Sequence, residues 1–359
     1  GQPRGILRGD IAASSSAALA GLLAGLDLAA GDTEKSRTAR LEKLVPLRLA
    51  GSLRLGARGD RSLDIAVDGT VRGARTIARF DVDGGPAGWR EGLVEASATV
   101  DSADVALTLA GLLHGEAGSV VLPDEAIRAG QLSFKAAGKP QAGMIAVATL
   151  KGDGLALEFD GRLTDPAAGA REIAGTVRVR AARAQPVLSL VGLDAAGTLR
   201  DARLAGVVEL SSRSGMVRIK PRGLTVGDSE VAGLVKLSRQ PGQPVVIDAA
   251  LQIASASVIG LLAPVLDRPR AAAGEVSALI ASEQYIWPEQ PFDFAVLDAI
   301  QGRIKLGIAK LMLDEGLELS DAALDIELSP GAVKVSNLEG RALGGEFKAR
   351  LVLEKAPLA

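Results

Sequence analysis

The chain contains no cysteine and a single histidine, His114. Without cysteine it can form no disulfide, iron–sulfur cluster, thiolate zinc site or thiol nucleophile. One histidine supplies at most one partner for a Ser-His-Asp triad. Its position directly after an expected helix is explained by the negative end of the helix dipole. We therefore expect no catalytic residue, no metal site and no cofactor, and we expect a protein that is not an enzyme.

Aromatic residues are also scarce, at 3% of the chain, although 47% of the residues are hydrophobic. Enzymes use aromatic rings to fill irregular cores and to build ligand pockets. Small aliphatic side chains suit a smooth, repetitive surface instead. The 41 basic and 43 acidic residues nearly cancel, whereas a nucleic-acid-binding protein carries a basic excess on one face. We expect no nucleic-acid partner.

No apolar run reaches the roughly 18–20 residues that a membrane span requires. The closest stretch, residues 14–28, is interrupted by serine, glycine and Asp27. The chain begins at Gly1 without methionine, within a strand-like pattern. We interpret it as a fragment whose signal peptide or membrane anchor is missing.

The strongest pattern lies in the last sixty residues, where apolar and polar positions alternate. Such alternation gives each strand one apolar and one polar face, and turn-forming sequences at 314–316, 329–331 and 344–345 separate the strands. The apolar positions expected to share a concave face and to line a lipid groove are Ile304, Leu306, Leu324, Ile326, Leu328, Val333, Val335 and Phe347. The positions expected to face water are Lys305, Asp325, Glu327 and Lys334.

Similar alternation, with turns every 8–12 residues or so, runs through most of the preceding chain. The sequence therefore predicts a mainly β fold, an elongated and twisted antiparallel β-meander that forms an open hydrophobic groove. Short capping helices are expected near 16–26, 104–113 and 256–266, each after a Ser or Asp that can cap it. We divide the chain into strand-rich groove segments at 1–115 and 116–244 and a C-terminal module, helix then meander, at 245–359.

The segment from Tyr285 to Phe294 concentrates much of the aromatic content of the chain. Two prolines keep this segment extended. We expect Trp287 and Phe292 to plug one end of the hydrophobic groove.

Several motifs follow each other in the C-terminal third of the chain. They are Trp-Pro-Glu-Gln-Pro-Phe-Asp-Phe at 287–294, Leu-Asp-Ala-Ile-Gln-Gly-Arg-Ile at 297–304, Leu-Ser-Asp-Ala at 319–322, Leu-Ser-Pro-Gly-Ala-Val at 328–333 and Gly-Gly-Glu-Phe at 344–347. Together they resemble the C-terminal region of the AsmA family of bacterial envelope proteins. The resemblance covers roughly residues 245–353, and the charged turn at 314–316 departs from it.

The resemblance implies a periplasmic protein with a β-groove, tethered to the inner membrane by an N-terminal helix that this fragment lacks. Such proteins are associated with outer-membrane assembly and are similar to bridge-like carriers of phospholipid between membranes. They are not enzymes. The partners implied are phospholipid acyl chains, the inner membrane and outer-membrane assembly proteins.

Two further interpretations stay open. In the first, the apolar face packs against the chain's own helices or against a protein partner, and the role is structural. In the second, paired carboxylates hydrolyse a glycan, which requires two carboxylates that converge in a cleft. The accessibility of the apolar face discriminates between the lipid-binding and the structural interpretation.

Overall fold

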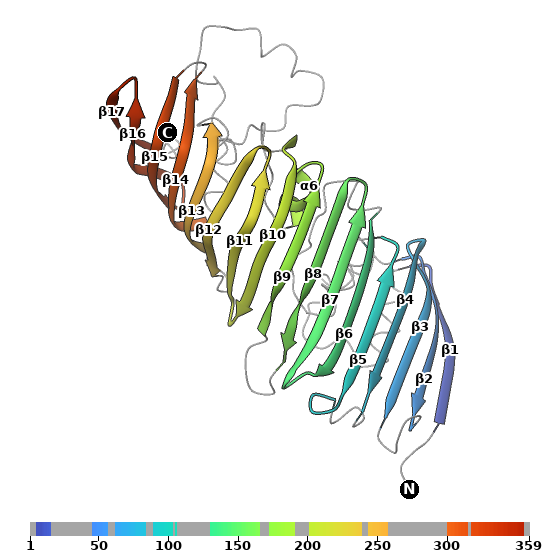
Figure 1. Cartoon of the computed structure of the whole chain (residues 1–359). Helices are drawn as coiled ribbons and strands as arrows, with labels where there is room; N and C mark the ends of the chain where they lie inside the picture. The colour runs from blue at the N-terminus through green and yellow to red at the C-terminus, as the bar shows by residue number, and fades with distance from the viewer. Residues whose placement is uncertain are drawn as a thin grey trace, which may run out of the picture. The chain divides into compact units, whose positions relative to one another are not determined.

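The computed structural model describes residues 5–15, 45–56, 62–83, 89–102, 105, 130–165, 172–190, 201–238, 243–257, 300–314 and 317–354 (Figure 1). Within these ranges, strands predominate. The chain forms two compact units. Unit 1 comprises Gly1–Gly192 and Arg203–Ser214, and unit 2 comprises Leu193–Ala202 and Gly215–Ala359. The three segments expected from the sequence stay predictions.

Unit 1 is an antiparallel meander in which each strand pairs with the next along the chain. Its strands are β1 (Gly5–Ala13), β2 (Leu47–Leu55), β3 (Leu63–Val71), β4 (Ala74–Val82), β5 (Val94–Val100), β6 (Gln131–Lys139), β7 (Gly143–Gly152), β8 (Leu155–Thr164), β9 (Glu172–Ala181) and β10 (Leu204–Arg213).

Unit 2 contains β11 (Met216–Val226), β12 (Ser229–Ser238), β13 (Val245–Ser257), β14 (Ile300–Asp314), β15 (Leu317–Ser329), β16 (Ala332–Ala342) and β17 (Gly345–Glu354). Consecutive strands pair antiparallel, except that β13 and β14 are parallel. A parallel pair needs a long crossover connection, and residues 258–299 separate these two strands. The meander expected over the last sixty residues is confirmed.

The turn between β16 and β17 shows how the sequence sets the hairpin geometry. Leu343 and Gly344 have φ of 51° and 81°, and they connect the paired residues Ala342 and Gly345. Two consecutive residues with positive φ are typical of a two-residue type I′ turn, whose twist matches that of the flanking strands. The turn lies one residue earlier than the sequence indicated.

The prediction of a mainly β, antiparallel meander with few helices is confirmed. The three expected helices fall almost wholly outside the described residues. Val105 is helical, and its N–H donates to Ser102 Oγ at 3.4 Å, the bond expected of an N-cap. Ala256 and Ser257, in contrast, belong to β13, so the third helix cannot begin at 256.

One described helix, α6 (Gln185–Leu190), is not expected from the sequence. Pro186 lies in its first turn, where a missing N–H costs nothing because the first helical N–H groups have no partner within the helix. Proline followed by apolar residues was the signal that could have identified this helix.

Candidate functional site

The register of unit 1 sorts its strand residues into two faces of opposite character. Residues directly opposite each other on paired strands share a face. Among the paired strand residues of unit 1, every Asp, Glu, Lys and Arg lies on one face, which we call the charged face. The other, the uncharged face, carries only glycine and apolar residues apart from Thr76 and Ser212. One side of this sheet is therefore suited to water and the other to apolar material.

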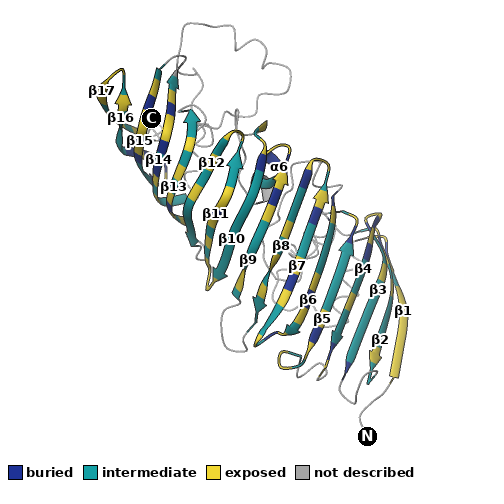
Figure 2. Cartoon of the chain, viewed as in Figure 1, coloured by how far each residue is buried: buried dark blue, intermediate teal, exposed yellow. Residues whose placement is uncertain are grey.

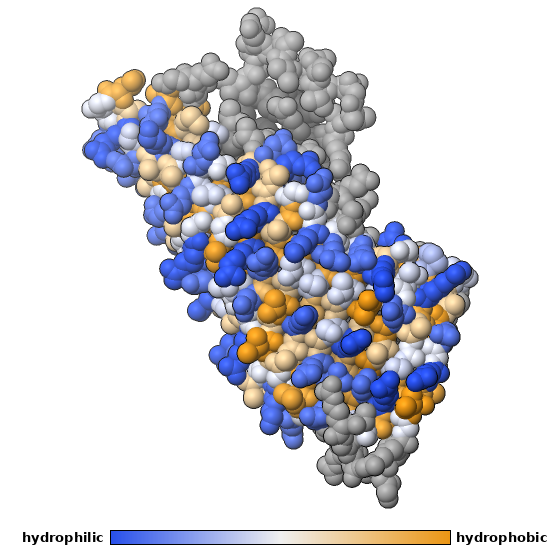
Figure 3. All heavy atoms as spheres, turned by 45° about the vertical axis from the view of Figure 1, so that its right-hand side comes forward, coloured by the Kyte–Doolittle hydropathy of each residue, from blue (hydrophilic) through white to orange (hydrophobic). Residues whose placement is uncertain are grey.

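Ion pairs connect neighbouring strands on the charged face. Arg75 lies 3.8 Å from Asp68, and Arg213 lies 2.9 Å from Glu172. All four side chains are more than one-third exposed, so these pairs add little to stability. Figure 3 shows hydrophilic side chains scattered among hydrophobic ones over the side of the molecule that it presents.

A single row of residues crosses all ten strands of unit 1 in the middle of the uncharged face. We call it the central row; its members are Gly9, Gly51, Val67, Ala78, Ala98, Phe134, Ala148, Phe159, Val177 and Val208. Gly9 is exposed and the other nine are partly buried. With roughly 4.8 Å between neighbouring strands, the row is about 40 Å long. It is a continuous, uncharged and partly accessible strip.

Buried positions lie on both sides of the central row (Figure 2). Toward one end of the strands, Leu47 and Val71 are 5% and 0% exposed and pack in a cluster with Val100 and Val105. Toward the other end, Val82 and Val94 are 2% and 1% exposed. The accessible strip is thus narrower than the uncharged face that contains it.

The eight groove residues expected from the sequence lie on one face of unit 2. The register places Ile304 opposite Ile326, Leu306 opposite Leu324, and Leu328 opposite Val333. Val335 lies opposite Ile326, and Phe347 packs against the same apolar cluster. Their common face is as predicted. Whether they contact lipid stays a prediction.

These residues are more buried than the residues of the central row. The buried members, at 2–8% exposure, are Leu306, Leu324, Leu328, Val333 and Val335. The other three, Ile304, Ile326 and Phe347, are partly buried and pack against the same clusters. In the described structure this part of the apolar face acts mainly as a packed core. The more accessible apolar strip is in unit 1, outside the segment that the sequence singled out.

The eight groove positions expected from the sequence omit three large buried residues of this core, Ile308, Leu311 and Leu319, at 2%, 0% and 0% exposure. The ladder between β14 and β15 passes from Ile308–Ala322 to Lys310–Ser320 and skips Ala309 and Asp321. Asp321 has a φ of 52°, an uncommon backbone conformation for a residue other than glycine. Beyond this irregularity Leu311, rather than Lys310, joins the buried cluster. Strict period-two alternation cannot reveal such a break.

The residues expected to face water occupy the opposite face of unit 2. Lys305 lies opposite Asp325, and Glu327 lies opposite Lys334. Arg303 Nη2 is 3.3 Å from Glu327 Oε1. The expected division of the final meander into an apolar and a charged face is therefore present.

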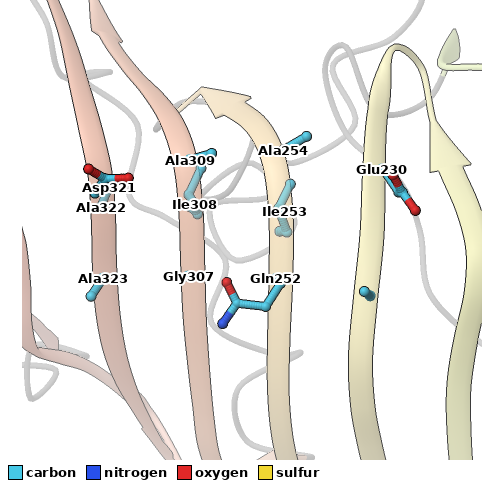
Figure 4. Close-up of a pocket in the computed structure, with 11 residues that line it drawn as sticks. Glu230, Gln252, Ile253, Ala254, Gly307, Ile308, Ala309, Asp321, Ala322 and Ala323 are labelled. Carbon is cyan, nitrogen blue, oxygen red and sulfur yellow. The ribbon is translucent and has the colours of Figure 1, made fainter.

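A depression of about 630 Å³ lies across β12–β15 in unit 2. Its lining includes alanines, Gly307 and the polar side chains of Glu230, Gln252 and Asp321. The Gln252 carboxamide is directed toward Gly307 (Figure 4), and a Cβ on Gly307 would lie 2.2 Å from Gln252 Oε1. Asp321 forms an ion pair with Arg341. Glu230 and Asp321 lie on β12 and β15, with two strands between them, so these carboxylates do not converge for glycan hydrolysis.

The remaining expected site residues, Trp287, Phe292 and His114, lie outside the described residues. Within the described ranges, no group of three or more His, Cys, Asp or Glu side chains could hold a metal ion. Searching the same ranges for a helix long and apolar enough to cross a membrane finds none.

Comparison with known proteins gives no relative. Neither a protein family, nor a curated protein, nor a solved structure matches the chain. The resemblance to the AsmA family therefore rests on the sequence motifs alone.

Proposed function

We propose that the protein is a non-enzymatic envelope protein of the AsmA type that binds phospholipid acyl chains on the uncharged face of unit 1. The observation that carries the proposal is the central row, an apolar strip that crosses ten strands without a charged residue and is only partly buried. Burial of each methylene contributes about 0.8 kcal/mol. A chain of methylenes can therefore be held along the strip without any specific polar contact.

The motifs of the C-terminal third supply the biological setting. They favour a periplasmic protein that is tethered to the inner membrane and carries phospholipid toward the outer membrane in support of its assembly. The balanced charge and the two-faced sheet agree with such a role, because one face remains hydrated while the other shelters lipid. No chemical step is required of any residue.

The alternative function is that of a structural or assembly factor whose apolar face binds a protein partner. The burial of Leu306, Leu324 and their neighbours favours this alternative in unit 2, because a face that is already packed offers little surface to lipid. In unit 1 the partly exposed central row favours lipid.

Photocrosslinking at two adjacent positions of β6 tests the proposal. Phe134 belongs to the central row, whereas Lys135 lies on the charged face. A photoreactive residue at 134 should capture phospholipid in cells, and one at 135 should not. Capture of a protein at 134, without lipid, would favour the assembly factor. Equal lipid capture at both positions would contradict a role for the uncharged face.

A further inference from the structure

Strand β1 forms an open edge of the sheet in unit 1. It pairs with β2 over its full length of nine residues, and Figure 1 draws it at the end of the strands of this unit. Residues 5–10 are all exposed, whichever face they lie on, and they include Ile6 at 61% and Leu7 at 69% exposure. The outward N–H and C=O groups of such an edge are available to a further strand.

The edge of β1 lacks several features that keep an exposed strand from pairing. Proteins protect such edges with proline, with a β-bulge or with a charge that points toward the core. β1 contains no proline, and its register with β2 is continuous, without a bulge. Its two charged residues, Arg8 and Asp10, both lie on the charged face. These two side chains therefore decide which partner strand the edge accepts.

The residues of β1 make the strand complementary to a second copy of itself. In an antiparallel pair centred on Gly9, Arg8 of each copy lies opposite Asp10 of the other, and opposite charges in such positions stabilise a sheet. On the uncharged face Leu7 lies opposite Ile11, and Gly9 lies opposite its own symmetry mate. Residues directly opposite share a face, so the uncharged faces of the two copies lie on the same side of the joined sheet.

Other registers of the same pair are unfavourable. A shift of two residues places Arg8 opposite Arg8 or Asp10 opposite Asp10, and like charges directly opposite are destabilising. A shift of one residue joins the charged face of one copy to the uncharged face of the other. Larger shifts leave fewer residues paired. The register centred on Gly9 satisfies both the charges and the faces.

We propose that β1 is a self-association surface, at which two copies of this chain pair antiparallel about Gly9 and join their sheets. The exposed side chains of Ile6 and Leu7 then lie opposite Ala12 and Ile11 of the second copy. The contact is isologous, because the same strand supplies both halves of it, and it closes as a dimer with twofold symmetry. The association does not depend on what the uncharged face of unit 1 binds.

Disulfide crosslinking tests the register. The native chain contains no cysteine, so a single introduced cysteine can form a disulfide only with another copy. Gly9→Cys places two thiols directly opposite each other, with about 4.5–5.5 Å between the Cβ atoms, which approaches the span of a disulfide. Mild oxidation should therefore convert this variant to a covalent dimer on a non-reducing gel.

Gly5→Cys is the matched control. Gly5 is exposed on the same face of β1 as Gly9, and a Cβ at either position meets no atom within 4 Å. In the proposed register, residue 5 lies opposite residue 13 of the second copy, so the two copies of residue 5 are roughly 27 Å apart. This variant should remain uncrosslinked under the same oxidation.

Charge reversal, followed by sedimentation velocity, tests the complementarity. Arg8→Asp alone, or Asp10→Arg alone, places like charges opposite each other at both symmetric positions and should weaken dimerisation about tenfold or more. Mixing the two variants makes every one of these pairs attractive again, and the mixture should dimerise. Arg79→Asp is the control, because it makes the same change at an exposed residue on the charged face of β4, and it should leave the native dimer unchanged.

The outcomes decide the proposal without ambiguity over folding, because a dimer regained on mixing requires both variants to be folded. Self-association lost in the single reversals and regained in the mixture, with crosslinking confined to Gly9→Cys, supports it. A native chain that stays monomeric overturns it. A dimer that survives both single reversals also overturns it, since such a dimer uses another surface. Equal crosslinking of Gly5→Cys and Gly9→Cys contradicts the register.

Discussion

Lys236 on β12 donates a hydrogen bond to Asp248 on β13, with 2.9 Å between Nζ and Oδ2. The two residues are directly opposite, and the same row continues through Arg303, Glu327 and Lys334 on the next three strands. Charges of opposite sign alternate along it. Because a slip of one residue would turn these charges toward the apolar face, the row helps to specify one register.

The pH dependence of this pair follows from the pKa of Asp248. The hydrogen bond and the charge of Lys236, with smaller contributions from Arg303 and Lys305, hold the pKa of Asp248 below its ordinary value. A carboxyl whose pKa is lowered on folding stabilises the protein above its unfolded pKa, and this contribution disappears as pH falls through the folded pKa. Asp248→Asn should therefore lower the free energy of unfolding slightly at neutral pH and have a smaller effect near pH 2, as urea titrations can measure. The effect is small because the pair is exposed. A difference of equal size at both pH values would contradict the assignment.

The irregularity in β14 predicts opposite effects at two adjacent positions. Leu311 is 0% exposed and Met312 is 51% exposed. Leu311→Ala should destabilise the protein by about 2–5 kcal/mol, since it leaves a cavity in the apolar cluster, whereas Met312→Ala should change stability by less than about 0.5 kcal/mol. Chemical denaturation of both variants checks this. A larger loss of stability for Met312→Ala than for Leu311→Ala would contradict the break in alternation at Ala309.

A second adjacent pair tests the faces of β15. Ile326 packs against the apolar clusters of unit 2, and Asp325 lies on the other face opposite Lys305. Ile326→Asp should cost several kcal/mol because an unpaired carboxylate would enter an apolar environment. Asp325→Asn should be nearly silent in the same thermal or urea unfolding experiment. Comparable losses for both variants would contradict the assigned faces.

The sequence predicted the fold class well because period-two alternation reports directly on the two faces of a strand. It predicted a common face for Ile304, Leu324 and Val335 for the same reason. Alternation carries no information on how deeply an apolar face is covered, so the sequence could not show that Leu306 and Val333 are buried while the row through Phe134 remains partly accessible. The parallel pairing of β13 and β14 was missed because it depends on where a long connection returns.

The depression on the polar side of unit 2 could not be predicted from the sequence alone. The depression near Gln252 forms where alanine and glycine are neighbours on four adjacent strands. These neighbours can be identified only when the strand register is known.

The central claim is that the uncharged face of unit 1 holds lipid. The most direct measurement is the amount of phospholipid that co-purifies with the protein, determined by native mass spectrometry for two variants of β7. Ala148→Asp places a charge in the central row, and Thr149→Asp places the same charge on the opposite face. Circular dichroism first checks that both variants are folded. The account then predicts that bound phospholipid is lost in Ala148→Asp and retained in Thr149→Asp. Equal phospholipid in the two variants, or none in the native protein, would contradict it.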